Sequence, residues 1–158
     1  MYNSDFNKIK RITKNLDLET SLNSICSYLE STINGYDWVG FYFHNEIKKE
    51  LELKAYSGIP TQHTKIPYGK GICGQTAESN KHMIVADVLK ESNYISCNVN
   101  VKSEIVVPIF FKNINVGQID IDSNIPNRFS KVDLEFLTSY LKTNNKSFSG
   151  DVYARLHN

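Results

Sequence analysis

Apolar residues recur at steps of three and four along residues 3–33, which is the spacing of an amphipathic helix. The pattern predicts two helices, or one helix broken near Asn15, and the pair Asn34-Gly35 predicts a stop. The apolar positions are Phe6, Ile9, Ile12, Leu16, Leu18, Leu22, Ile25, Cys26, Leu29 and Ile33.

Beyond Gly35 the pattern changes to the aromatic enrichment and partial alternation of β-strands. A turn at residues 112–115 joins the last two predicted strands into a hairpin. The predicted strands cover residues 38–43, 51–56, 82–85, 104–111 and 116–122.

Residues 72–79 predict a short helix, and 57–70 and 87–103 predict loops, of which the second is long enough to form a lid or a binding loop. Ser130 can cap a final helix, and the tail after Asn144 is too polar to place. The apolar stripe of that helix is Val132, Phe136, Leu137, Tyr140 and Leu141.

These elements predict an α+β fold in one domain that spans residues 1–158. The terminal helices should pack on one face of an antiparallel sheet, because each has a single apolar stripe to bury. The other face is then free to carry a ligand pocket.

Composition narrows the classes of partner. The 158 residues hold 18 basic and 17 acidic side chains, and this balance argues against nucleic acid as a partner. The longest apolar run, 105–111, is too short to cross a membrane, and the polar N-terminus has no signal-peptide core, so a cytoplasmic protein is expected. The three cysteines lack C-x-x-C spacing, so we expect free thiols and no disulfide framework.

The stretch GKGICG, residues 69–74, has the G-x-G-x-x-G pattern of a dinucleotide-binding loop but contains Cys73. Pro67 and Tyr68 precede it where a buried strand is required, and the nearest acidic residues that follow, Glu78 and Asp87, are too close. The pattern therefore favours a turn and a helix start that position a thiol.

The three cysteines occupy different environments. Cys97 lies in the polar loop NYISCNVN, which is typical of a reactive thiol. Cys73 falls in the first turn of the short helix, where the helix dipole favours a thiolate, although simple packing under the helix explains it as well. Cys26 lies on an apolar stripe and is interpreted as a core residue.

Three carboxylates fall in one region of the predicted hairpin. A period of two puts Asp120 and Asp122 on one strand face, and Glu104 begins the apolar run of the neighbouring strand. A solvated sheet face explains the aspartates alone, whereas Glu104 opposite them and Cys97 seven residues upstream of Glu104 favour a functional cluster. A metal site at these carboxylates is possible, but its ligands would be all oxygen and unspecific. The histidines show no ligand spacing, so no metal site is expected.

Alternation also places Trp38, Gly40 and Tyr42 on one face of the first strand. Gly40 should leave open space between the two rings. The pair therefore forms either a cage for an apolar or cationic ligand group or ordinary core packing.

The segments WVGFY, IPYGKGICGQTA, VADVL, SEIVVPI with its upstream cysteine, VGQIDIDS and NRFSKVDLEFL occur in this order between Trp38 and Leu137. Together they resemble the GAF-fold free methionine-(R)-sulfoxide reductases. The resemblance implies a reductase of free methionine sulfoxide in which Cys97 is the nucleophile. It further implies that a second thiol resolves the resulting sulfenic acid, and that an external dithiol such as thioredoxin supplies the electrons without a bound cofactor.

By the same resemblance, Glu104, Asp120 and Asp122 would hold the sulfoxide oxygen and the ammonium group of the substrate. Trp38 and Tyr42 would enclose its methylthio end. Glu104 and Asp120 also belong to the catalytic set, because clustered carboxylates raise each other's pKa and one can then hold a proton for the leaving oxygen.

The chain departs from the family pattern around both cysteine loops. His63 stands where the family usually has a resolving cysteine, and Tyr94 and Asn98 replace a histidine and an aspartate around the nucleophile. Either Cys73 or a small thiol then resolves the sulfenic acid.

The alternative interpretation is a non-catalytic GAF module that binds a small molecule or senses redox state. The chain length favours the enzyme, since a sensor usually carries a fused output domain. The amphipathic terminal helices permit a homodimer.

Overall fold

Six antiparallel strands form one sheet in the part of the chain that the computed structural model describes, residues 2–95 and 98–157. The order across the sheet is β3-β2-β1-β6-β5-β4. The strands are β1 (Trp38–Asn45), β2 (Glu50–Ser57), β3 (Lys65–Pro67), β4 (Met83–Val85), β5 (Ser103–Phe111) and β6 (Ile114–Ser123). The helices are α1 (Asn3–Ile12), α2 (Leu18–Thr32), α3 (Gly71–Ser79) and α4 (Lys131–His157), with a 3-10 turn, η1, at Val88–Lys90.

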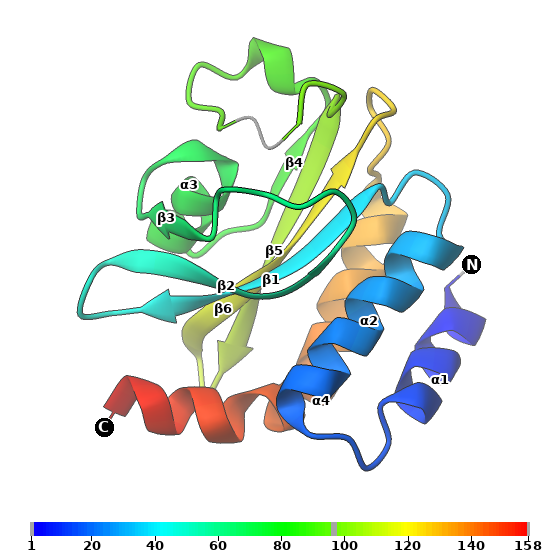
Figure 1. Cartoon of the computed structure of the whole chain (residues 1–158), viewed down its shortest axis with the longest axis vertical. Coiled ribbons are helices and arrows are strands. Elements are labelled where there is room, and N and C mark those ends of the chain that lie inside the picture. The colour runs from blue at the N-terminus through cyan, green and yellow to red at the C-terminus, as the bar shows by residue number, and fades with distance from the viewer. Residues whose placement is uncertain (1, 96–97, 158) are drawn as a thin grey trace.

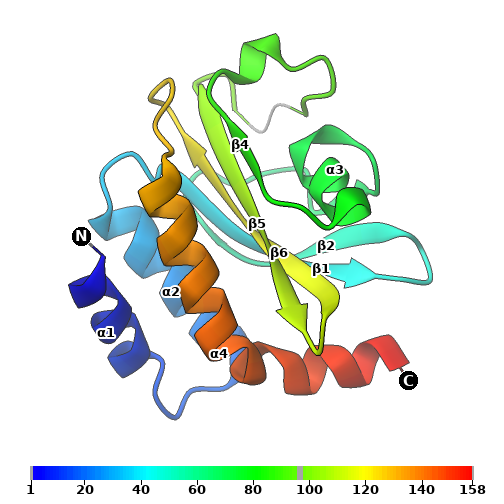
Figure 2. The same ribbon diagram turned by 180° about the vertical axis from the view of Figure 1, so that it is seen from behind.

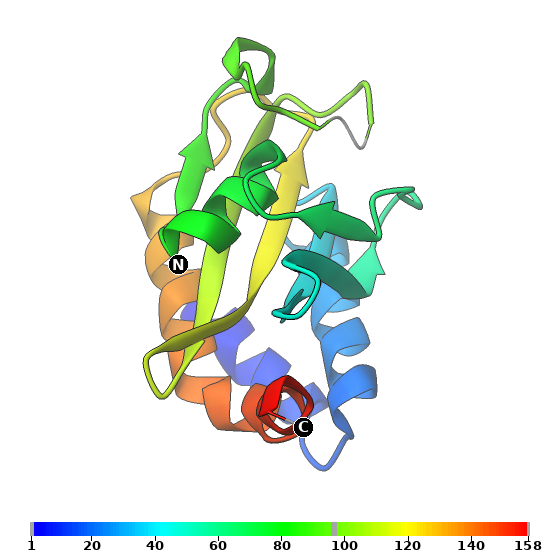
Figure 3. The same cartoon turned by 90° about the vertical axis from the view of Figure 1, so that its left-hand side faces the viewer.

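The two faces of the sheet carry different helices. Helices α2 and α4 pack on one face, with α1 beside them (Figures 1 and 2). Helix α3 covers part of the opposite face, in front of the sheet in Figure 3. The predicted α+β arrangement, with terminal helices on one face and a second face left for a site, is confirmed.

Strand alternation divides the buried side chains between these two faces. Val39 and Phe41 of β1 belong to the larger core under α2 and α4, whereas Trp38 and Tyr42 belong to a smaller core under α3. Cys26 lies fully buried in the larger core, as its position on the helical stripe predicted.

Local signals explain where the N-terminal helices begin and end. Asn15 has a φ of 64° and separates α1 from α2, so the prediction of two helices is confirmed. Asp17 caps α2, since its Oδ1 accepts a hydrogen bond of 3.0 Å from the Thr20 N–H. Ser130 caps α4 as predicted, because its Oγ accepts from the Val132 N–H at 3.3 Å.

The structure corrects three details of the sequence interpretation and places the tail, which the sequence left open. The hairpin turn consists of Lys112 and Asn113 alone, both with positive φ, so β6 begins at Ile114. The predicted loop 57–70 contains β3, whose short, mixed composition gave no strand pattern. Val132 is 45% exposed, and its neighbour Asp133 is buried instead. The polar tail after Asn144 continues α4 to His157.

No helix among the described residues combines the length and the apolar character that crossing a membrane requires.

Candidate active site

The register of three central strands gathers the predicted site residues on the face that carries α3. Trp38 pairs with Asp122 across β1 and β6, and Gly40 pairs with Asp120. Glu104 of β5 is the partner of Asp122 on its other side. The three carboxylates are at most 5% exposed, so they form a buried cluster and not a solvated sheet face.

Helix α3 adds a thiol to this cluster. The Sγ atom of Cys73 lies 3.9 Å from Oε1 of Glu104. One side-chain ligand atom from each of Cys73, Glu104 and Asp120 lies within 4.8 Å of the other two. A thiol and two carboxyl groups from three different elements thus share one small volume.

The glycines of GKGICG explain how α3 comes so close to the sheet. Gly71 has a φ of 64°, which side chains rarely adopt and which starts the helix abruptly. A Cβ on Gly74 would lie 2.6 Å from the Pro67 carbonyl oxygen, so only glycine fits against this backbone. The motif shapes a turn and places Cys73 in the first helical turn, as the sequence predicted.

Burial dominates the electrostatics of the thiol. It raises the pKa of Cys73 well above the usual range, and the neighbouring Asp120 and Glu104 carboxylates raise it further. The helix dipole was expected to favour a thiolate here, and this expectation is wrong. Full burial beside negative charge outweighs the dipole, so Cys73 is a protonated thiol at neutral pH.

The aspartates are also shifted towards their protonated forms. Burial raises the pKa of Asp122 well above its ordinary value, and the charge of Asp120 adds to this effect. Burial also raises the pKa of Asp120, although hydrogen bonds from Glu104 and Cys73 act in the opposite direction. Burial therefore favours protonated carboxyl groups in this cluster, which can act as proton donors within a dry site.

The aromatic pair forms a packed wall and not an open cage. The indole of Trp38 folds back over Gly40 and fills the space above it, so the expectation of open space between the rings is wrong. The ring centroids of Trp38 and Tyr42 are 6.4 Å apart, and Trp38 also stacks on Tyr56 at 5.9 Å. The space that a side chain at position 40 would occupy is thus filled by the indole of Trp38.

The segment between β2 and β3 holds both rings in place. Trp38 Nε1 donates a hydrogen bond of 3.0 Å to the Ile59 carbonyl oxygen, and the Tyr42 hydroxyl donates one of 2.9 Å to the His63 carbonyl oxygen. His63 therefore contributes backbone to the wall of the site.

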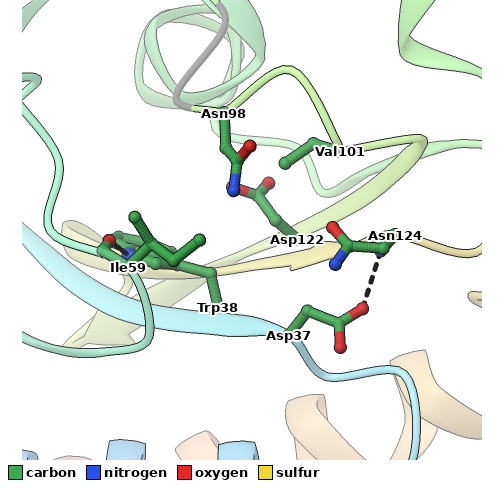
Figure 4. A pocket seen from close by; sticks show the side chains of 7 residues that line it. All are labelled: Asp37, Trp38, Ile59, Asn98, Val101, Asp122 and Asn124. Carbon is green, nitrogen blue, oxygen red and sulfur yellow. Dashed lines mark hydrogen bonds between the residues drawn. The ribbon is translucent and has the colours of Figure 1, made fainter.

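A small pocket opens beside this wall, with a cavity volume of about 30 Å³. In Figure 4 the side chains of Asn98 and Asp122 point towards one another across it. The sequence predicted Trp38 and Asp122 as site residues. The lining also includes Asp37, Ile59, Asn98, Val101 and Asn124.

Sequence reasoning had little chance of finding these additional lining residues. Asp37 precedes β1, and its Oδ2 accepts a hydrogen bond of 2.7 Å from the backbone N–H of Asn124, which follows β6. Only the pairing of β1 with β6 brings them together. Only Asn98 could have been suspected from the sequence, because it directly follows the predicted nucleophile.

Cys97 lies outside the described residues, so its role as the nucleophile stays a prediction. The residues before it are placed against α3. Ile95 packs against Gly71, and the Asn93 side chain hydrogen-bonds the backbone of Gly69 and Gly71. The residues that precede the predicted nucleophile in the sequence are therefore held at the start of the helix that carries Cys73.

Comparison with known proteins agrees with this arrangement. Residues 15–142 match the GAF domain family. The free methionine-R-sulfoxide reductase of Escherichia coli is 30% identical over 131 residues, which cover 83% of this chain and 76% of that protein.

Solved structures extend the likeness to the whole fold. The X-ray structure of free methionine-R-sulfoxide reductase from Neisseria meningitidis in complex with its substrate matches with a TM-score of 0.88 and 29% identity, covering 97% of this chain and 91% of that one. The structure of fRMsr of Staphylococcus aureus in complex with substrate matches with a TM-score of 0.83 and 33% identity, covering 92% of this chain and 94% of that one. This chain belongs to the GAF-domain family and, within it, to the family of free methionine-(R)-sulfoxide reductases.

Proposed function

We propose that this protein reduces free methionine-(R)-sulfoxide to methionine, with Cys97 as the nucleophile. The observation that supports it most is the buried contact of Cys73 with Glu104 and Asp120 on the sheet face that also carries Asp122. Relatives with the same fold have been solved with their substrate and are named for this activity.

The reaction uses two thiols, which supply the two electrons for each sulfoxide reduced, so it requires no bound cofactor. The Cys97 thiolate attacks the sulfoxide sulfur, the sulfur–oxygen bond breaks, and the oxygen leaves on Cys97 as a sulfenic acid while methionine is released. The Cys73 thiol then attacks this sulfenic acid, forming a disulfide and releasing water. An external dithiol, such as a thioredoxin-like protein, reduces the disulfide and closes the cycle.

The carboxyl cluster supplies the proton that the first step requires. The sulfoxide oxygen gains negative charge as the thiolate attacks, and a protonated carboxyl group beside it lowers the barrier. Burial raises the pKa of both aspartates and so favours their protonated forms. We assign this acid role to Asp120 or Glu104, which lie next to the thiol of Cys73.

The free amino acid carries an ammonium group, which a peptide-bound methionine lacks. Asp122 lines the pocket and its carboxylate form can bind this ammonium. A bound cation favours the ionised form of the aspartate, so substrate binding lowers its pKa. The apolar side of the pocket, formed by Trp38, Ile59 and Val101, suits the methylthio end.

The environment of Cys73 suits a resolving thiol better than an attacking one. Its raised pKa leaves little thiolate at neutral pH, so it does not compete with Cys97 for the sulfoxide. Asp120 lies within reach to accept its proton when the sulfenic acid forms nearby.

The test is turnover of four compounds with a thioredoxin system as the reductant. These are the (R) and (S) epimers of free methionine sulfoxide and of its N-acetylated form. We expect turnover of the free (R) epimer, and kcat/KM at least about tenfold lower for the N-acetylated (R) epimer, since the ammonium contact is lost. Cys26→Ala is the matched thiol control and should keep its activity, because Cys26 belongs to the opposite core.

No turnover of any of the four compounds would contradict the proposal. The chain would then be a non-catalytic GAF module whose pocket binds another metabolite.

A further inference from the structure

We propose that Cys73, Glu104 and Asp120 form a three-ligand site for a divalent transition-metal ion of the Zn²⁺ type, and that this ion competes with the substrate. The competition rests on the proposed function, because it assumes that the same carboxyl groups bind methionine sulfoxide. The metal site itself does not depend on any activity.

The geometry of the three side chains is close to that of a zinc site. Tetrahedral Zn²⁺ binds sulfur at about 2.3 Å and oxygen at about 2.0 Å, which separates a sulfur and an oxygen ligand by about 3.5 Å. The Sγ of Cys73 lies 3.9 Å from Oε1 of Glu104, and all three candidate atoms lie within 4.8 Å of one another. Small side-chain movements suffice to close the site.

A separate observation points to a missing positive partner. The Oδ1 atom of Asp120 is buried and has no hydrogen-bond partner in the described part of the chain, and the side chain is only 2% exposed. A buried carboxylate oxygen without a partner is costly. A metal ion bound by this oxygen would remove that cost.

The charge balance of the cluster also favours a dication. Three acidic groups share a dry volume, which they can occupy only if they hold protons or bind a cation. A divalent ion displaces the protons of such a cluster and neutralises the charge that remains.

The ligand types select the kind of metal. One thiolate with two carboxylates suits borderline ions such as Zn²⁺ and Co²⁺, whereas Mg²⁺ and Ca²⁺ prefer oxygen alone. The sequence allowed only an unspecific, all-oxygen site at the carboxylates and led us to expect no metal, since the spacing in the chain does not reveal that α3 brings Cys73 to them. The pocket beside Asp122, the strand partner of Glu104, offers a path of entry.

The test is an anaerobic titration of the reduced, metal-free protein with Co²⁺, followed by Zn²⁺. We expect one Co²⁺ per chain, with a thiolate-to-cobalt charge-transfer band and the visible bands of tetrahedral cobalt, both of which Zn²⁺ removes. Cys73→Ser should lose the charge-transfer band, and Asp120→Asn and Glu104→Gln should each weaken binding by more than about tenfold.

Two matched controls identify the ligands. Asp37→Asn removes a carboxylate that lines the neighbouring pocket and lies outside the trio, and Cys97→Ser removes the other predicted active-site thiol. Both should keep the cobalt spectrum. Circular dichroism of each variant distinguishes a lost ligand from a lost fold.

The proposal is overturned if no Co²⁺ binds at micromolar protein, or if the band survives Cys73→Ser in a folded protein. Competition is measured separately, as the methionine sulfoxide concentration that halves the cobalt signal. A cobalt spectrum without turnover would refute the proposed function alone, and turnover without a cobalt spectrum would refute the metal site alone.

Discussion

The side chain of Asn93 binds the backbone of Gly71, the first residue of α3, from 22 positions further along the chain. Its Oδ1 accepts a hydrogen bond of 2.8 Å from the Gly71 N–H, and its Nδ2 donates one of 2.7 Å to the Gly69 carbonyl oxygen. Gln75 adds a third bond to the Asn93 carbonyl oxygen at 3.1 Å. These bonds join the loop that precedes Cys97 to the helix turn that holds Cys73.

Asn93→Ala should therefore slow the formation of the Cys73–Cys97 disulfide while costing little stability. Two partly solvated hydrogen bonds contribute about 1 kcal/mol to folding. The measurements are the rate of disulfide formation after one turnover and the urea midpoint. Asn100→Ala, an exposed change in the same loop, is the control, and an equal rate in both variants would show that Asn93 does not position the loop.

The wall formed by Trp38 should contribute mainly to substrate binding. Trp38→Leu removes the stacking on Tyr56 and the bond to Ile59, while it keeps an apolar group in the pocket. We expect KM to rise about tenfold, which corresponds to about 1.4 kcal/mol, with a smaller change in kcat. Tyr56→Phe, which keeps the stacked ring, should have a near-normal KM. A fall in kcat alone would instead place Trp38 in the chemical step.

Asp122 should reduce the stability of the ligand-free protein at neutral pH. Burial raises its folded-state pKa well above the ordinary value of 3.8, so the folded state holds its proton more tightly than the unfolded state. The free energy of unfolding therefore falls as pH rises above about 4, up to the folded-state pKa. Asp122→Asn removes this loss and should be more stable than the unmodified protein at pH 7.

Denaturant unfolding of both proteins at pH 4 and pH 7 tests this prediction. The difference in the free energy of unfolding should be larger at pH 7 than at pH 4. The same variant should bind methionine sulfoxide more weakly, because the neutral amide does not attract an ammonium group. A pH-independent difference would mean that the buried charge is not the cause.

Asp133 has the opposite effect on stability. It is 1% exposed and accepts hydrogen bonds from the hydroxyls of Tyr2 at 2.7 Å and Tyr36 at 2.8 Å, and from the Ser130 N–H at 2.9 Å. Burial acts to raise its pKa, but these bonds and the charge of Arg128 outweigh burial, so the pKa lies below the usual 3.8.

The stabilisation by Asp133 is therefore complete above about pH 4 and is lost as pH falls through its lowered pKa. Asp133→Ala should cost about 3 kcal/mol at pH 7, because it leaves buried donors without acceptors. The measurement is the urea midpoint, with Glu135→Ala on the exposed side of the same helix as the control. A loss below about 1 kcal/mol would mean that water replaces the carboxylate.

Patterns within one element predicted most of the sheet and of the site face. A period of two placed Asp120 and Asp122 together on the face that also carries Trp38, and the helical period predicted the break at Asn15. Such patterns work because the geometry of a single element determines them. Contacts between elements cannot be predicted in this way. The hydrogen bonds of Asn93 and the burial of Cys73 both depend on how separate elements pack together, which the local sequence does not reveal.

The same limit explains the errors of interpretation. The helix dipole suggested a thiolate at Cys73, but the approach of α3 to the carboxylates decides its protonation. Gly40 suggested open space, but the indole of Trp38 fills it. In both places a tertiary contact reversed a sound local expectation.

A single-turnover experiment tests the proposed thiol chemistry most directly. The fully reduced protein is mixed with one equivalent of free methionine-(R)-sulfoxide and no external reductant. Methionine is quantified, and the cysteines are mapped by mass spectrometry after alkylation. We expect about one methionine per chain and a Cys73–Cys97 disulfide, with Cys26 still alkylated as a free thiol. Unchanged sulfoxide, with all three cysteines still reduced, would contradict the proposed function.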